Sequence, residues 1–267
     1  MSCILLYLAL GSVAGVLAGL LGIGGGLVIV PMLTFVFTGQ GVAHTHILHL
    51  ALGTSLASIV FTSISSLRSH HKRGAVIWPV VLKITPGILF GTFLGTWIAT
   101  GLSTNFLKGF FALFLCYVAT QMLLGIKPAP ARDIPGPGGV FAAGSIIGLF
   151  SSFVGIGGGT LSVPFLMWCN TVVHKAIGTS AAIGFPIAVA GTLGYVVNGL
   201  SAEGLPPWSL GFVNLGALAG IAAASVCTAP LGVRLAHALP VDRLKKIFAI
   251  LLYVVGVRMV LSIWYVQ

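Results

Sequence analysis

The chain has 267 residues and a formal net charge of +10, yet only 6% of its residues are charged and 57% are hydrophobic. Soluble domains carry about 25% charged residues, so this composition excludes an ordinary soluble protein. A nucleic-acid site needs basic residues clustered on one face, whereas here they lie in short segments between apolar runs. We therefore expect an all-α polytopic membrane protein, with the lipid bilayer as a partner and no nucleic acid.

Apolar runs long enough to cross a bilayer recur along the chain. A spanning helix needs about 20 apolar residues, and such runs cover residues 3–22, 76–100, 104–125, 209–233 and 247–266. The first run has no basic segment before it and no small-residue cleavage site after it, so we do not expect a cleaved signal peptide.

Two glycine clusters interrupt these apolar stretches. Residues 22–26 read Gly-Ile-Gly-Gly-Gly and are followed by Pro31, and residues 155–159 read the same and are followed by Pro164. Each glycine costs about 1 kcal/mol against alanine in a helix interior, so both clusters predict breaks. In lipid, a broken backbone survives only where protein buries it or where it lines a cavity. A break in each half of the chain indicates a transporter with internal repeats.

A second motif supports the duplication. Residues 49–57 and 174–182 agree at six of nine positions, including Gly-Thr-Ser. Between the halves lies a segment rich in proline and glycine, which is typical of a connection. We therefore expect a first transmembrane repeat over residues 1–126, a cytoplasmic inter-repeat loop over 127–138 and a second transmembrane repeat over 139–267.

The basic residues predict how the repeats are oriented. If each break lies inside a single crossing, the loop charges divide five and five between the two sides. If each break turns the chain around, ten of the 13 Lys and Arg residues fall on one side, and the opposite loops 39–48, 100–106 and 199–208 contain none. The positive-inside rule favours the second arrangement. It predicts two inverted-topology repeats, each with a Gly-broken helical hairpin plus about three transmembrane helices, and both termini outside.

The arms that follow the breaks are short. Residues 27–38 would form only about 18 Å of helix at 1.5 Å per residue, and residues 160–170 form less. We expect half-helices that begin at Leu27 and Thr160 and end within the protein, although fully spanning hairpins stay open. A helix N-terminus presents unpaired N–H groups and about half a positive charge, which favours an anion.

With both glycine clusters, their downstream prolines and both Gly-Thr-Ser motifs, the whole chain resembles the sulfite exporter TauE/SafE family of membrane carriers. The resemblance implies a multi-pass protein of the cell (inner) membrane that moves a small sulfur-containing anion of the sulfite, sulfonate or sulfoacetate type. It leaves the substrate and the direction of transport open.

The candidate substrate-binding residues share a place in a duplicated motif or, for one arginine, deep in the last apolar run. They are Gly22, Gly24, Gly25, Gly26, Thr54, Ser55, Gly155, Gly157, Gly158, Gly159, Thr179, Ser180 and Arg258. The glycines let a ligand approach the backbone without a Cβ in the way. The hydroxyls can instead bond to carbonyls one turn back, and the arginine can extend outward to the interface.

Coupling groups are scarce. The three acidic residues, Asp133, Glu203 and Asp242, all lie in loops, so we expect no carboxylate proton relay inside the membrane. His49 and His174 occupy matching positions and could carry protons or serve packing. The four cysteines form no Cys-x-x-Cys pair, so we expect no metal site and no redox motif. Catalytic spacing motifs are missing, so we expect no enzyme, and we expect no cofactor. An anion channel and an intramembrane sulfur-handling enzyme are the alternatives, and a homodimer stays open.

Overall fold

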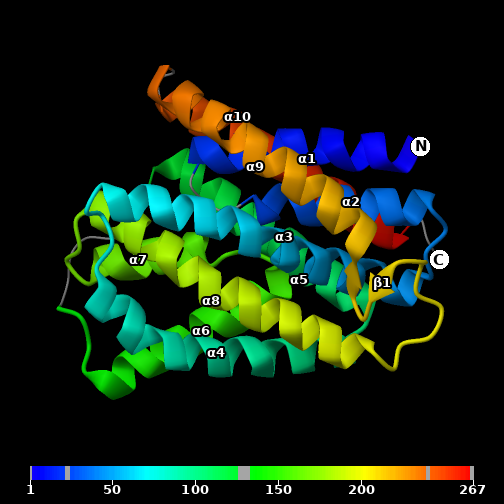
Figure 1. The fold of residues 1–267 in the computed structure, drawn as a ribbon, viewed down its shortest axis with the longest axis horizontal. Helices are drawn as coiled ribbons and strands as arrows, with labels where there is room; N and C mark the ends of the chain where they lie inside the picture. The colour runs from blue at the N-terminus through cyan, green and yellow to red at the C-terminus, as the bar shows by residue number, and fades with distance from the viewer. Residues whose placement is uncertain (1, 22–24, 126–132, 239–240, 265–267) are drawn as a thin grey trace.

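The computed structural model describes residues 2–21, 25–125, 133–238 and 241–264, which fold almost entirely into helices (Figure 1). The helices are α1 (Ser2–Leu21), α2 (Gly26–Gly39), α3 (His44–Lys72), α4 (Trp78–Gly101), α5 (Thr104–Leu124), α6 (Pro137–Val154), α7 (Gly159–Trp168), α8 (Val173–Gly199), α9 (Leu215–Ala238) and α10 (Val241–Trp264). A hairpin of two short strands, β1 (Ser209–Leu210) and β2 (Val213–Asn214), precedes α9.

The outer surface of this bundle is apolar. Within the described residues, α3, α4, α5, α6 and α8 are each long and apolar enough to cross a membrane. Large side chains such as Leu82, Trp97 and Leu113 point outward and are about two-thirds exposed, at 69%, 67% and 71%. A helix satisfies its backbone hydrogen bonds internally, which lipid requires. The prediction of an all-α polytopic membrane protein is confirmed.

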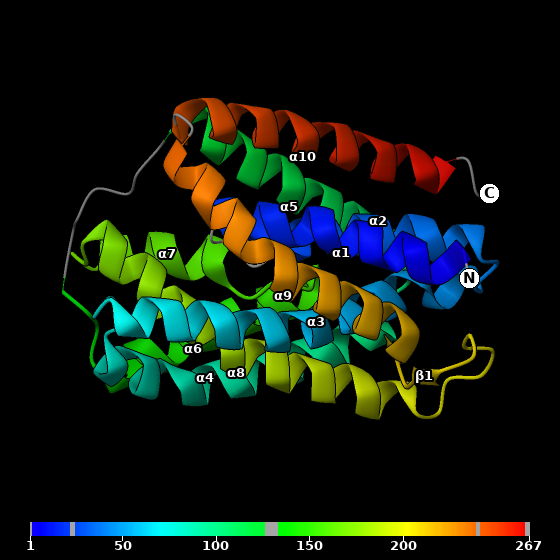
Figure 2. The same cartoon turned by 45° about the horizontal axis from the view of Figure 1, so that its top comes forward.

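The ten helices of the described residues form two sets of five with the same order, a hairpin of one longer and one shorter helix followed by three long helices. Matching helices lie side by side, α3 against α8 and α5 against α10, while α1 packs on α9 and α4 packs on α6. In both views α3 runs away from the end that holds the chain termini and α8 runs back toward it (Figures 1 and 2). How the two sets sit in a membrane stays a prediction.

Exposed basic residues gather where α3 ends and α8 begins, which is one end of the bundle (Figure 1). Arg68, Lys72 and Arg73 lie at the close of α3, and Lys175 lies in the first turn of α8. The connection between α2 and α3, residues 40–43, lies at the opposite end and carries no charge. Which end faces the cytoplasm stays a prediction.

The apolar run 209–233 does not begin as a helix. Its first residues form the β1–β2 hairpin, in which Leu210 pairs with Val213, and α9 starts only at Leu215. Gly211 makes the turn with φ of 54°, and the Phe212 N–H donates to the Tyr195 carbonyl at 3.1 Å. Apolar residues are buried in strands as well as in helices, so the composition of this run does not distinguish a β-hairpin from the first turns of a helix.

Glycines allow the backbones of two helix pairs to come into direct contact between the halves, α4 with α6 and α1 with α9. A Cβ on Gly91 of α4 would overlap the Ser145 carbonyl oxygen of α6. In the matching pair, a Cβ on Gly11 of α1 would lie 2.7 Å from the Ile221 carbonyl oxygen of α9. Small residues at such positions allow the close helix packing that holds membrane proteins together, because lipid supplies little hydrophobic drive between helices.

Candidate functional site

The second glycine cluster forms a sharp break. Helix α6 ends at Val154 and α7 begins at Gly159. Gly155 and Gly158 have φ of 65° and 74°, in the left-handed region that costs other residues about 1–2 kcal/mol. The helix stops and restarts here because glycine adopts these angles without that cost.

The first cluster is described from Gly25 onward, while Gly22 and Gly24 lie outside the described residues. Gly25 has φ of 60° and directly precedes α2. The two short helices begin at Gly26 and Gly159, one residue before the expected starts, because glycine fits both the turn and the first helical position.

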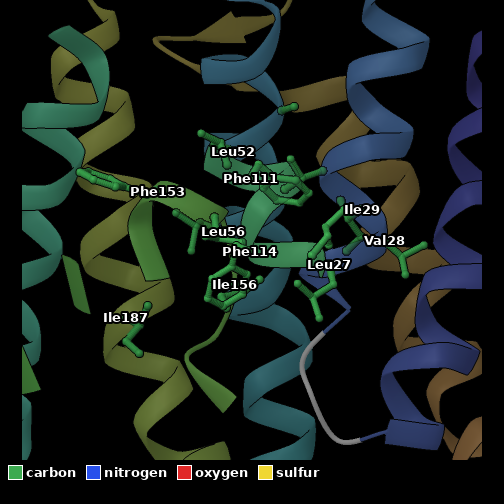
Figure 3. Packing of buried hydrophobic residues seen from close by; sticks show 14 of the residues in the cluster. Leu27, Val28, Ile29, Leu52, Leu56, Phe111, Phe114, Phe153, Ile156 and Ile187 are labelled. Atoms are coloured by element: carbon green, nitrogen blue, oxygen red, sulfur yellow. The ribbon is translucent and has the colours of Figure 1, made fainter. Parts of the chain in front are cut away.

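The two breaks touch each other. A Cβ on Gly26 would overlap the Gly155 carbonyl oxygen and lie 3.1 Å from Ile156 Cα. Ser55 of α3 joins the same place, because its Oγ donates to the Gly155 carbonyl at 2.8 Å. In Figure 3 the start of α2, at Leu27, lies beside Ile156. The structure thus brings together three of the candidate residues, Gly26, Ser55 and Gly155, and their binding of substrate stays a prediction.

Hydroxyls hold the start of α7. The Gly158 carbonyl accepts the N–H groups of Leu161 at 3.0 Å and Ser162 at 2.8 Å. Ser162 Oγ also donates to it at 2.9 Å and lies 2.6 Å from Ser180 Oγ. Since the single hydrogen of Ser162 goes to Gly158, Ser180 donates within the serine pair. Ser180 is therefore fixed at the second break.

Helices α3 and α8 cover the glycines of the second break. A Cβ on Gly157 would lie 3.2 Å from Ile59 Cγ2, near the middle of α3. A Cβ on Gly158 would overlap Ile187 Cδ1, a side chain that α8 directs toward the break (Figure 3). The space that these glycines leave free of a Cβ is thus, in part, occupied by side chains of α3 and α8.

Two hydroxyls at the second break have no hydrogen-bond partner within the described part of the chain. They belong to Ser151, in the last turn of α6, and to Thr160, in the first turn of α7. The sequence analysis did not select either residue for binding. The available signal was the difference between the two copies, since the first copy has Ala18 and Leu27 at these positions.

Thr54 and Thr179 form equivalent hydrogen bonds between the two halves. Thr54 Oγ1 accepts the Asn214 N–H at 3.0 Å, and Thr179 Oγ1 accepts the Ile77 N–H at 3.0 Å. Both hydroxyls are fully buried, and each holds the segment that leads into α9 or α4. Their expected contact with substrate stays a prediction beside this observed role.

The structure does not place three other candidates at the breaks. Arg258 is exposed on α10, with its guanidinium 4.6 Å from the centre of the Phe35 ring. His174 is exposed in the first turn of α8. Buried His49 lies near the end of the bundle opposite to His174, and its ring nitrogens are each 3.0 Å from a carbonyl oxygen, that of Thr45 or that of Ala99.

The chemistry at the breaks is that of hydrogen-bond donors. Two helices, α2 and α7, start there, and the first N–H groups of a helix have no acceptor within it. Among the described residues, no group of three His, Cys, Asp or Glu side chains could hold a metal ion. Asp133 and Glu203 are exposed in loops. The arrangement suits a small anion.

An apolar bundle with two broken helices in contact at its middle defines a polytopic membrane transporter. The model of a family described as "Sulfite exporter TauE/SafE" matches residues 7–259. The chain belongs to this family.

Relatives agree with this assignment. The chain is 40% identical over 261 residues to a "Probable membrane transporter protein" of Haemophilus influenzae, covering 97% of this chain and 98% of the relative. It is 28% identical over 262 residues to a protein of the same description from Methanocaldococcus jannaschii, covering 96% and 95%. No solved structure matches.

Proposed function

We propose that this protein carries a small sulfur-containing anion, of the sulfite, sulfonate or sulfoacetate type, outward across the cytoplasmic (inner) membrane. The observation that carries the proposal is the contact between the two breaks, where Gly26 meets Gly155 and two helices begin. The positive ends of α2 and α7 then act on one place, each equivalent to about half an elementary charge. Anions are favoured there and cations are disfavoured.

The position of the breaks fits alternating access. They lie beside the middle of α3, since Gly155 approaches Leu52 and Gly157 approaches Ile59. Transporters with broken helices bind substrate near the bilayer midplane and expose it to one side and then the other by motion of their repeats. In the proposed cycle, the two inverted halves rock around this shared site.

Export needs no carboxylate. A membrane potential that is negative inside favours movement of an anion outward by about 2.3 kcal/mol per charge at 100 mV. A histidine could add proton coupling, and His49 is the buried candidate with both ring nitrogens next to carbonyl oxygens.

Flux measurements with purified protein in liposomes test the proposal. Sulfite, methanesulfonate and sulfoacetate efflux should saturate with concentration, and external unlabelled anion should accelerate release of labelled anion. Flux that rises linearly and shows no counterflow would mean a channel. Absence of flux for all three anions, with folded protein, would refute the proposed substrate class.

A further inference from the structure

Unpaired buried hydroxyls mark one of the two breaks. Within the described part of the chain, three buried side-chain hydroxyls lack a hydrogen-bond partner, those of Thr92, Ser151 and Thr160. Leaving a buried polar group unpaired is unfavourable, and each such group in a native protein calls for an explanation, an absent ion among them. Two of the three flank the second break, which therefore stands out from the rest of the bundle.

Ser151 points at the start of α7. Its Oγ lies 3.4 Å from the place where a Cβ on Gly158 would be, and the side chain is fully buried. Its backbone is fixed there, since its carbonyl accepts the Ile156 N–H at 3.1 Å. Thr160, which is 8% exposed, is the second residue of α7. Both hydroxyls thus accompany the first N–H groups of this helix.

The sequence of the first break has no hydroxyl side chain at the matching positions. The positions that match Ser151 and Thr160 hold Ala18 and Leu27. Leu27 is 2% exposed and belongs to the apolar core with Ile29, which takes the place of Ser162 (Figure 3). The two breaks share the same glycine motif, but the second has hydroxyl side chains where the first has apolar side chains.

We propose that the oxygens of the transported anion are bound at the second break by the hydroxyls of Ser151 and Thr160, together with the first N–H groups of α7. The apolar wall of the same site is formed by Ile187 of α8 and Ile147 of α6, whose side chains lie with Ser151 Oγ around Gly158. This proposal rests on the proposed function and adds to it the ligating residues and an unequal division of labour between the repeats.

An unequal site selects by the shape of the anion. Sulfite and organosulfonates carry three oxygens on one side of the sulfur, whereas sulfate carries oxygens on all sides. One polar wall can satisfy three oxygens, but a fourth would turn toward Ile187 and lose its hydrogen bonds, which is costly for a buried charged group. The site therefore takes sulfite and sulfonates and rejects sulfate.

Three variants test the proposal in purified protein, each removing one unpaired hydroxyl: Ser151→Ala, Thr160→Val and the matched control Thr92→Val. Calorimetric titrations use sodium salts of sulfite, methanesulfonate, sulfate, phosphate and chloride, each repeated with the choline salt, and a thermal scan of each variant reports folding. Loss of a hydrogen bond to a charged ligand corresponds to a fall in affinity of about ten-fold or more. We expect this fall for sulfite in the Ser151 and Thr160 variants, unchanged affinity in the control, and no loss of thermal stability in any.

The outcomes separate the two proposals. Sulfite binding at parental affinity in both site variants would overturn the role of the hydroxyls and leave the proposed function standing. Parental binding of phosphate or chloride but of no sulfur anion, weakened by the same two changes, would keep the hydroxyl site and refute the sulfur substrate. Binding of no anion at all would overturn both. Binding that needs sodium and is lost in choline salts would show that the hydroxyls hold a cation, which also overturns the proposal.

Discussion

Replacing Gly158 by alanine should destabilise the protein for two separable reasons. The residue has φ of 74°, which costs alanine about 1–2 kcal/mol. The added methyl also overlaps Ile187 Cδ1, and overpacking of a core costs about 1–3 kcal/mol. Together these effects predict a loss of about 2–5 kcal/mol in the free energy of unfolding.

Ile187→Val removes the overlapping carbon and supplies the matched partner for a double-mutant cycle. Alone it should cost about 0.5–1.5 kcal/mol. Combined with Gly158→Ala it should cost only about 1–2 kcal/mol, because the new methyl fills the vacated space and only the backbone strain remains. Equilibrium unfolding in mixed detergent micelles measures all three variants. Additive losses would refute the packing argument, since they would mean that the two side chains do not meet.

The same double variant separates packing from binding. A methyl at position 158 would still lie 3.4 Å from Ser151 Oγ and crowd the proposed ligand. We therefore expect stability to recover in the double variant while sulfite affinity stays low. Recovery of both would show that Gly158 serves helix packing alone.

Four further outcomes can be checked. Single cysteines at Gly41 and Ser201, in a background without the native cysteines, should react with an impermeant thiol reagent from outside, and one at Ser69 should not; labelling of 69 and 201 from one side would contradict inverted repeats. Thr179→Val should cost on the order of 1 kcal/mol in unfolding free energy by leaving an N–H before α4 unpaired, with sulfite affinity unchanged if the hydroxyl serves only this hydrogen bond. His49→Leu should lower the free energy of unfolding by about 0.5–1.5 kcal/mol, because it removes the hydrogen bond of the imidazole while the Ala99 carbonyl keeps the Leu102 N–H as a donor; an unchanged midpoint of unfolding would argue against the imidazole bond. Changing the chain's three acidic residues together to amides should leave liposome transport intact, and loss of a pH-gradient response would show that a loop carboxylate carries the proton.

The sequence predicts the backbone plan better than the site. Glycine density and proline placement locate both breaks to within one residue of the helix starts, because glycine's backbone cost is local. The hairpin before α9 was missed because its residues are as apolar as a helix and are held by Tyr195 and Thr54, far away in the sequence.

Repetition predicts some of the buried hydroxyls and passes over others. Repeat symmetry selected Thr54 and Thr179, whose observed partners are backbone N–H groups of the opposite half, and their contact with substrate stays a prediction. Ser151 and Thr160 stand out through a difference between the copies, and a search for identities passes over them. Their lack of partners depends on three-dimensional packing, which no local pattern encodes.

The glycine contacts between helices bear on what counts as a folding unit. Gly91 of α4 needs the backbone of α6, and Gly11 of α1 needs that of α9, so each of these seams joins one repeat to the other. A chain cut between α5 and α6 would leave both seams open, with bare backbone grooves facing lipid that cannot fill them. Neither fragment could close its own groove. The two fragments should insert into the membrane together, and either one alone should be degraded. The duplicated chain therefore folds as one cooperative unit although its sequence contains two repeats.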